Sequence, residues 1–224
     1  MTVLGLDGAL GSFSASVARE DTTLAAVSLT GNVALESGIS AIRDVMAEAD
    51  VTPRDLSRIA VGIGPGAFTG LRITIAYAKS LAQAWNLPLA GISSFDILEF
   101  GLERDRVLTV VVGRPGIISA RYRSGTTERR GSGKTHDVLA GMLDGIGDKS
   151  LDVIGAPEDV IAYLAEGGFT VNLLMPPVTP AAAALALAGV SAPAAPSIHA
   201  VRADYGEAPI AKVPTFRPTD RGSR

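Results

Sequence analysis

The sequence predicts an α/β protein of two lobes with like topology, each a mixed sheet flanked by helices. The first observation is that the hydrophobic period changes along the first hundred residues, from strand-like runs to helical spacing and back. The second is that the later half repeats this order of elements more weakly. The third is the composition: 47% of the 224 residues are hydrophobic and 19% are charged, which is too apolar for a disordered chain.

Three strands are expected at the start of the chain. Residues 3–6 form a short apolar run that ends at Asp7, which is typical of a strand buried on both faces. Residues 12–17 alternate serine with apolar side chains, which predicts a half-exposed strand paired with the first. A third strand is expected over residues 24–29.

The rest of the first half alternates helices with strands. Apolar residues recur every three to four positions over residues 39–49, which predicts an amphipathic helix. A buried strand at residues 59–63 leads through a glycine-rich loop into a second helix, residues 71–85. A strand at residues 89–92 follows, and Ser93-Ser94 caps a short helix.

The second half has a similar order. Its expected elements are strands 107–112 and 118–123, a Gly-, Ser- and Thr-rich connection 124–135, helix 138–143, strand 151–154, helix 158–165, strand 169–174 and an Ala-rich helix from residue 181. We therefore expect an N-terminal lobe of residues 1–103 and a C-terminal lobe of residues 104–190. A Pro-rich tail of residues 191–224, extended or ordered by a partner, completes the chain.

Composition excludes several classes of protein. The net charge of −3 lacks the basic excess with which a protein grips nucleic acid unaided. The absence of cysteine excludes disulfides, cysteine zinc sites and thiol nucleophiles, and two histidines leave little for a histidine metal cluster. The N-terminus does not resemble a signal peptide, and the longest apolar run, residues 181–190, is about half of a membrane span. We expect a cytoplasmic protein without membrane contact.

Two glycine-rich segments invite comparison with nucleotide-binding loops. The segment GSGKT, residues 131–135, resembles the end of a P-loop, but Glu128 stands where that motif needs glycine, so a flexible loop is favoured. Gly64, Gly66 and Gly70 are spaced one residue too widely for the dinucleotide fingerprint. That loop either holds an anion or turns tightly, and tight-turn packing is the favoured interpretation.

Asp7 ends the first strand, where a carboxylate could orient a magnesium-bound phosphate. The favoured alternative is a turn-forming Asp-Gly pair. Asp7, Gly64 and Gly66 are thus weak candidates for cofactor binding. His136 and His199 have no ligand neighbours, and no nucleophile-elbow pattern surrounds Ser93-Ser94. A small basic cluster is either a solvated face or an RNA contact within a complex, and it comprises Arg121, Arg123, Arg129 and Arg130.

Three sequence blocks carry a resemblance to a known family. They are VGIGPGAFTGLRI at residues 61–73, AKSLA at residues 78–82 and LPLAGISS at residues 87–94. Together they resemble the TsaB (YeaZ) family, the dimerisation subunit of the bacterial machinery that makes threonylcarbamoyladenosine in tRNA. The resemblance implies a duplicated actin-like, Hsp70-like (ribonuclease H-like) fold.

The resemblance also implies a non-catalytic scaffold subunit. The family tends to have Asp-Thr-Ser where this chain has Asp7-Gly8-Ala9, and the H-x-x-x-H metal motif of the related catalytic subunit is missing. ATP and metal are therefore expected on partner subunits, namely the catalytic threonylcarbamoyl transferase and an ATPase. tRNA would be met only through the complex, and no catalysis is expected from the chain alone. Homodimer and monomer both stay open for the isolated chain.

A second function is kept beside the first. An independent nucleotide-dependent small-molecule kinase of the same fold would use Asp7 to orient magnesium and residues 64–70 to contact nucleotide. The short second lobe and the lack of a second acidic residue in a recognisable catalytic turn disfavour it.

The helices at residues 39–49 and 71–85 are the expected partner interface. Small side chains on more than one side of the second helix allow a neighbouring helix to approach closely. We expect Ala78→Arg to abolish association without unfolding the monomer; the alternative is that the first helix covers this face within the same chain. The expected interface residues are Ile39, Ile42, Met46, Phe68, Thr69, Leu71, Arg72, Ile75 and Ala78.

Overall fold

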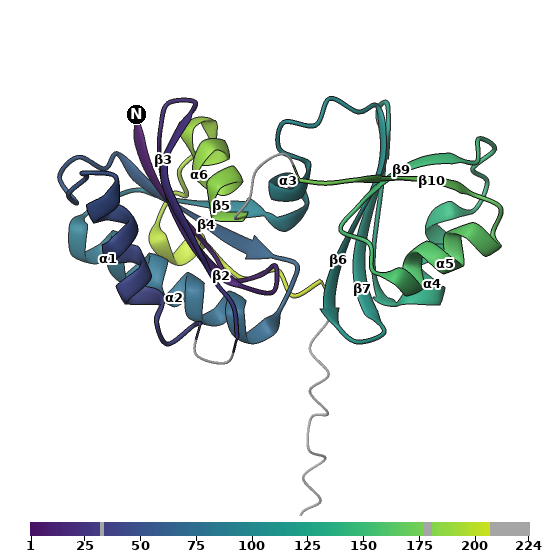
Figure 1. The fold of residues 1–224 in the computed structure, drawn as a ribbon, viewed down its shortest axis with the longest axis horizontal. Coiled ribbons are helices and arrows are strands. Elements are labelled where there is room, and N and C mark those ends of the chain that lie inside the picture. Colours follow the sequence, from purple (N-terminus) through teal and green to yellow (C-terminus); the bar gives the residue numbers. More distant parts are fainter. Residues whose placement is uncertain (32–33, 177–180, 207–224) are drawn as a thin grey trace, which may run out of the picture.

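The structure, a computed structural model, describes residues 1–31, 34–176 and 181–206. Two lobes lie side by side, each built on a five-stranded mixed sheet with helices against it (Figure 1). The two sheets have the same strand order when each lobe is counted from its own first strand. This confirms the duplicated α/β architecture that the order of sequence elements predicts.

The first sheet has the order β3-β2-β1-β4-β5. Its strands are β1 (Thr2–Asp7), β2 (Phe13–Arg19), β3 (Thr22–Leu29), β4 (Arg58–Gly64) and β5 (Leu89–Ser93). The strands β1, β2 and β3 pair antiparallel, whereas β4 pairs parallel with both β1 and β5. All six residues of β1 are buried, as the continuous apolar run predicts for a strand covered on both faces.

The second sheet has the order β10-β9-β6-β7-β8. Its strands are β6 (Arg106–Arg114), β7 (Ile117–Ser124), β8 (Thr127–Lys134), β9 (Ser150–Ile154) and β10 (Thr170–Leu174). The prediction of a loop over residues 124–135 is wrong, because most of this stretch is the edge strand β8. Its polar sequence lacks a strand signal, and antiparallel pairing with β7 determines its conformation instead.

Six α-helices and one 3₁₀ turn are described. They are α1 (Gly38–Glu48), α2 (Phe68–Trp85), α3 (Ser94–Glu99), α4 (Thr135–Leu143), α5 (Glu158–Glu166), α6 (Ala181–Ser191) and η1 (Ile198–Ala200). Helices α1 and α2 cover one face of the first sheet, while α6 and α3 cover its other face (Figure 1). Helices α4 and α5 cover the second sheet.

The prediction that residues 181–190 belong to the C-terminal lobe is wrong. Helix α6 returns to the first sheet, where Ala184 and Leu185 pack against Val3 and Ala60. The first lobe therefore contains residues from both ends of the chain. The chain after α6 also packs on this lobe as far as residue 204, and residues 207–224 of the expected tail lie outside the described residues.

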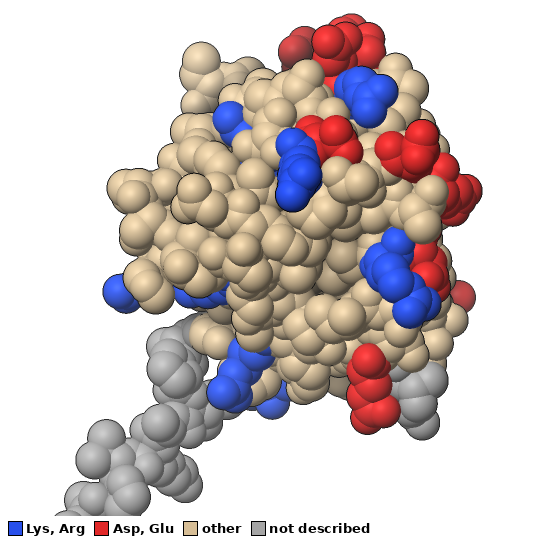
Figure 2. Space-filling view, turned by 90° about the vertical axis from the view of Figure 1, so that its left-hand side faces the viewer, with Lys and Arg blue, Asp and Glu red and all other residues tan. Residues whose placement is uncertain are grey.

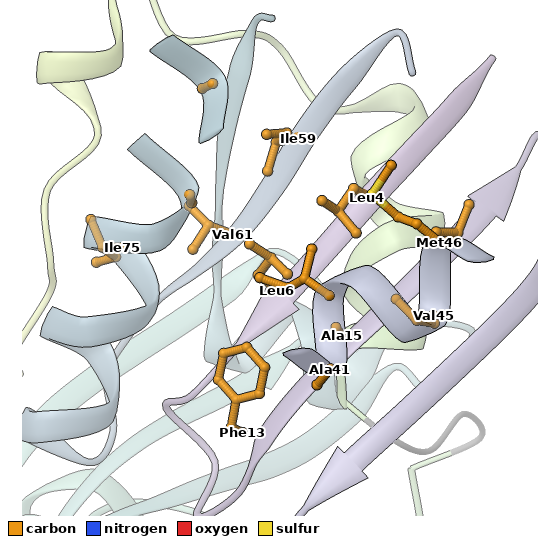
Figure 3. Packing of buried hydrophobic residues seen from close by; sticks show 14 of the residues in the cluster. Leu4, Leu6, Phe13, Ala15, Ala41, Val45, Met46, Ile59, Val61 and Ile75 are labelled. Carbon is orange, nitrogen blue, oxygen red and sulfur yellow. The ribbon is translucent and has the colours of Figure 1, made fainter. Parts of the chain in front are cut away.

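The core of the first lobe lies between the sheet and helices α1 and α2. Figure 3 shows its side chains, which come from these helices and from β1, β2 and β4 and point toward one another. Phe13, Leu4 and Leu71 are almost fully excluded from solvent. Burying each such side chain stabilises the fold by roughly 1.5–3 kcal/mol before entropy losses.

A buried ion-pair network joins the two lobes. Glu99, at the end of α3, accepts three hydrogen bonds. Nε of Arg121 donates at 3.1 Å and Nε of Arg123 donates at 2.6 Å. The hydroxyl of Thr109 is the third donor. Asp96 pairs with Arg121 at 2.6 Å. Burial alone would lower the pKa of Arg121, but Asp96 and Glu99 outweigh that effect and raise it.

Within the described parts of the chain, none of the helices combines the length and the apolar character that crossing a bilayer requires.

Substitution of two helical glycines tests the close packing of α6 on the first sheet. A Cβ at Gly189 would lie 2.6 Å from the Ala60 Cβ and 3.1 Å from a Val3 methyl group, so Gly189→Ala should destabilise the protein by about 1–3 kcal/mol. Gly141 in α4 has open space beside it, so Gly141→Ala should instead stabilise by up to about 1 kcal/mol. Urea unfolding measures both; equal effects of the two changes would contradict the packing argument.

Candidate functional site

The turn after β1 is organised by the side chain of Asp7. Its Oδ2 accepts hydrogen bonds from the backbone N–H groups of Ala9 at 3.1 Å and Leu10 at 3.2 Å. An aspartate that caps its own turn in this way favours the tight connection from β1 to β2. This is the turn-forming role that the Asp-Gly pair predicts.

The second oxygen of Asp7 is buried and has no hydrogen-bond partner among the described residues. It faces Gly62 in β4, where a Cβ would overlap it. Burial raises the pKa of Asp7 from 3.8 to about 6, and the two backbone hydrogen bonds only partly oppose this shift. The carboxylate is therefore held in the interior of the lobe.

The glycine-rich loop at residues 64–70 packs directly on this turn. The N–H of Ala67, the N-cap residue of α2, donates to the carbonyl oxygen of Ala9 at 2.9 Å. A Cβ at Gly70 would overlap the carbonyl oxygen of Gly8, so only glycine permits this approach. The carbonyl groups of Gly8 and Ala9 therefore lie against the start of α2. In a helix that binds an anion, the N–H groups at this end are open to the ligand.

The favoured interpretation of Gly64 and Gly66 also agrees with the geometry. Gly64 has a φ of +99°, in the left-handed region that glycine tolerates. A Cβ at Gly66 would overlap the carbonyl oxygen of Ala9. Both glycines serve close packing between loops of the chain itself.

The other candidate residues have local partners. The Ser93 hydroxyl accepts from the N–H of Phe95 at 3.3 Å and caps α3, as predicted. The GSGKT segment runs from the end of β8 into α4. His136 lies on the surface of α4 beside Tyr163, and His199 lies in η1.

The predicted basic cluster is not a free surface. Arg121 is buried and, with Arg123, is paired with Glu99. Arg129 donates to the carbonyl oxygens of Met142 and Asp144, and Arg130 pairs with Glu128. The strand pattern predicts Arg121 on an exposed face, but α3 covers that face. Sequence reasoning missed Glu99, although two arginines on one face of a strand were a signal for a buried acidic partner.

The expected interface residues divide into two groups. Five of them belong to the core of the first lobe itself: Ile42, Met46, Leu71, Ile75 and Ala78. Ile39, Phe68, Thr69 and Arg72 are exposed. Because Ala78 is fully buried in the core of the first lobe, the structure leads us to expect that Ala78→Arg destabilises the monomer.

The outward face of α2 carries mostly short side chains, and Arg72 is the charged residue among those that form it. Five of its exposed residues form an outward stripe: Thr69, Arg72, Ala76, Ser80 and Gln83. Figure 2 shows the end of the molecule that carries α1 and α2, where a broad area left of the centre contains no charged side chain. Helix α1 adds the exposed Ile39, half of whose surface is accessible.

Comparisons with known proteins agree with these features. The family model described as TsaD, tRNA N6-adenosine threonylcarbamoyltransferase, matches residues 35–204. The TsaB protein of Bacillus subtilis is 34% identical over 100 residues, which cover 44% of this chain and 43% of that protein. The TsaB protein of Escherichia coli is 29% identical over 120 residues, 52% of each chain.

The chain belongs to the TsaB (YeaZ) branch of the TsaD family. The aligned segments span about half of the length of these two TsaB relatives. A Pseudomonas aeruginosa structure, described as an uncharacterized protein with similarity to peptidase YeaZ, superposes with a TM-score of 0.71 at 22% identity, covering 92% of this chain and 99% of that chain. YeaZ from the same organism gives 0.63 at 24% identity, with coverages of 85% and 91%. The duplicated two-lobed α/β fold that the resemblance implies is thereby confirmed.

The burial of Asp7 predicts a specific pH dependence of stability. Because its pKa of about 6 in the folded chain exceeds the ordinary 3.8, the folded state binds the proton more tightly, and this group destabilises the fold as pH rises through that window. The effect is on the order of 3 kcal/mol at neutral pH. Asp7→Asn keeps a turn acceptor without the charge, so it should match the wild type near pH 4 and be more stable at pH 7.

Urea unfolding of both proteins between pH 4 and pH 7 measures this difference. Other carboxylates, including Asp55 and Asp148 with lowered pKa values, are present in both proteins and cancel. A loss of stability in Asp7→Asn that grows as the pH rises from 4 to 7 would contradict this account and indicate that the folded state favours the charged form of Asp7.

Proposed function

We propose that the chain is a non-catalytic scaffold subunit in tRNA N6-threonylcarbamoyladenosine biosynthesis, which modifies the adenosine beside the anticodon. Its proposed role is to pair with the catalytic threonylcarbamoyltransferase subunit. Membership of the TsaB branch supports the pathway. A relative named tRNA N6-adenosine threonylcarbamoyltransferase, from Moorella thermoacetica, is 33% identical over 130 residues, 55% of this chain and 36% of that protein, and supports kinship with the catalytic partner.

The observation that carries the scaffold role is the closed packing of the turn at residues 7–11 on the start of α2. An actin-like kinase would need these two segments to admit phosphate groups. Here the Ala9 carbonyl accepts from Ala67, and Gly8 lies against Gly70. The residues that the kinase alternative assigns to nucleotide binding are engaged in packing within the lobe.

Partner subunits would supply the binding of ATP, metal and tRNA. ATP and the catalytic metal would be held by the ATPase and transferase subunits, and tRNA would be met through the complex, in keeping with the net charge of −3. The isolated chain would pair with a second copy through the same surface. With this function we propose a cytoplasmic location.

The proposed docking surface is the outward stripe of α2 together with the exposed Ile39 of α1. A helix face with short side chains allows a partner helix to approach near the lower end of the usual distance range. The buried residues of the expected interface contribute indirectly, since they fix both helices on the sheet.

Activity assays test the scaffold role. The purified chain with tRNA, threonylcarbamoyl-AMP and metal should produce no modified tRNA, and addition of the catalytic subunit should give product. Calorimetry of the lone chain with ATP and magnesium should show no binding. Low-micromolar ATP binding, or product from the lone chain, would favour the kinase or an autonomous enzyme.

Three alanine-to-arginine changes test the docking surface. Ala76→Arg adds a large cation to the exposed stripe, so it should leave folding intact and raise the Kd for the catalytic subunit about tenfold or more. Ala78→Arg, two residues away and fully buried, should destabilise the fold by about 3 kcal/mol or more. Ala140→Arg on the exposed face of α4 is the matched control and should change neither. Calorimetric titration and thermal unfolding measure these effects, and unchanged binding by Ala76→Arg would exclude this surface.

A further inference from the structure

The chain after α6 forms a C-terminal strap, residues 192–206, that lies along the first lobe. The N–H of Ala195 donates to the carbonyl oxygen of Leu89 at 2.8 Å, which pairs the strap with β5. Val201 is 4% exposed and belongs to the core of the first lobe. The strap is therefore a packed part of this lobe.

The end of the strap is fixed beside the glycine-rich loop. The N–H of Asp204 donates to the carbonyl oxygen of Ile63 at 2.7 Å, and the N–H of Gly206 donates to the Asp204 carboxylate at 2.8 Å. A Cβ at Gly64 would overlap the carbonyl oxygen of Asp204. Tyr205, between these anchored residues, is held in one place on the surface.

Tyr205 completes a cluster of three planar groups. Its ring lies 5.0 Å from the ring of Phe68 at an angle of 35°, and the Arg72 guanidinium lies 5.1 Å from the centre of the Phe68 ring. Despite these contacts, Phe68 is 55% exposed and Tyr205 is 41% exposed. We call these three residues the aromatic patch.

The charge of the aromatic patch is not balanced locally. Arg72 forms no ion pair within residues 1–31, 34–176 and 181–206, and the first turn of α2 contains no acidic side chain. A guanidinium has several N–H donors, and a carboxylate can accept two of them side by side. The patch therefore combines an apolar surface with an available anion-binding group.

We propose that the aromatic patch is a docking site for a protein segment that presents a carboxylate flanked by apolar side chains. For the identity of the partner, this inference rests on the proposed function: the segment belongs to the catalytic subunit. Arg72 also belongs to the outward stripe, so the patch extends the proposed surface onto the strap. Tyr and Arg anchors are typical of the residues that dominate binding energy.

Two further points favour a protein over an RNA partner. The patch contains a single cationic side chain, whereas binding a nucleic acid backbone takes several, and the net charge of the chain is −3. The patch is also held in position before binding, which reduces the entropy cost of ordering its side chains in an interface.

Calorimetric titration of the full-length chain with the catalytic subunit, at low and high salt, tests this proposal. Tyr205→Ala and Arg72→Ala should each raise the Kd about tenfold. Arg202→Ala, an exposed arginine of the same strap, is the matched control and should change the Kd by less than about twofold. The affinity of the wild type for the catalytic subunit should fall with added salt. The affinity of Arg72→Ala should fall less, because this variant lacks the charge that pairs with the partner's carboxylate. Thermal unfolding should show all variants folded.

The outcomes separate this proposal from the proposed function. If Ala76→Arg weakens binding while Tyr205→Ala and Arg72→Ala bind like the wild type, the aromatic patch is overturned and the scaffold role stands. If the wild type does not bind the catalytic subunit, both are overturned. A band-shift assay tests RNA binding by the patch. If the wild type binds tRNA, Arg72→Ala does not, and both bind the catalytic subunit equally well, then the patch contacts RNA and the protein-docking proposal fails.

Discussion

The N-terminal lobe depends on backbone segments that approach one another too closely for a side chain to lie between them. Gly70 in α2 lies against the carbonyl group of Gly8, and Ala67 donates to Ala9. This contact fixes the first turn of α2 against the end of β1. Because an α-helix is stiff over eighteen residues, the direction of its whole outward face follows from that one contact.

The same contact limits the chemistry of the lobe. A glycine-rich loop before a helix binds phosphate when its N–H groups are open to a ligand. In this chain the carbonyl groups of residues 8 and 9 lie there instead, and Asp7 uses one oxygen on its own turn. The positions from which an actin-like enzyme would bind nucleotide thus stabilise the frame that presents α1 and α2, which is the arrangement a docking subunit needs.

Sequence periodicity predicted most elements of both lobes, because buried strands and amphipathic helices carry strong local signals. It did not predict β8, whose polar residues become a strand only through pairing with β7, nor the lobe to which α6 belongs, since an alanine-rich helix has no polar face. The candidate site shows the same limit. Helical spacing separates Ala76 from Ala78, but only the fold reveals that Ala78 faces the sheet, and nothing local marks Tyr205.

Two connections of different kinds tie the second lobe to the first. Glu99 joins them through directional hydrogen bonds, which specify an orientation better than apolar contacts do, even where apolar residues would stabilise as much. The strap crosses the same boundary: Val201 is buried in the first lobe, while a Cβ at Gly206 would overlap the Ser119 hydroxyl of β7. The end of the strap therefore lies where the two lobes meet, next to Tyr205. The second lobe contributes no side chain to the aromatic patch, yet Ser119 and Ser132 lie beside Gly206, the residue that follows Tyr205.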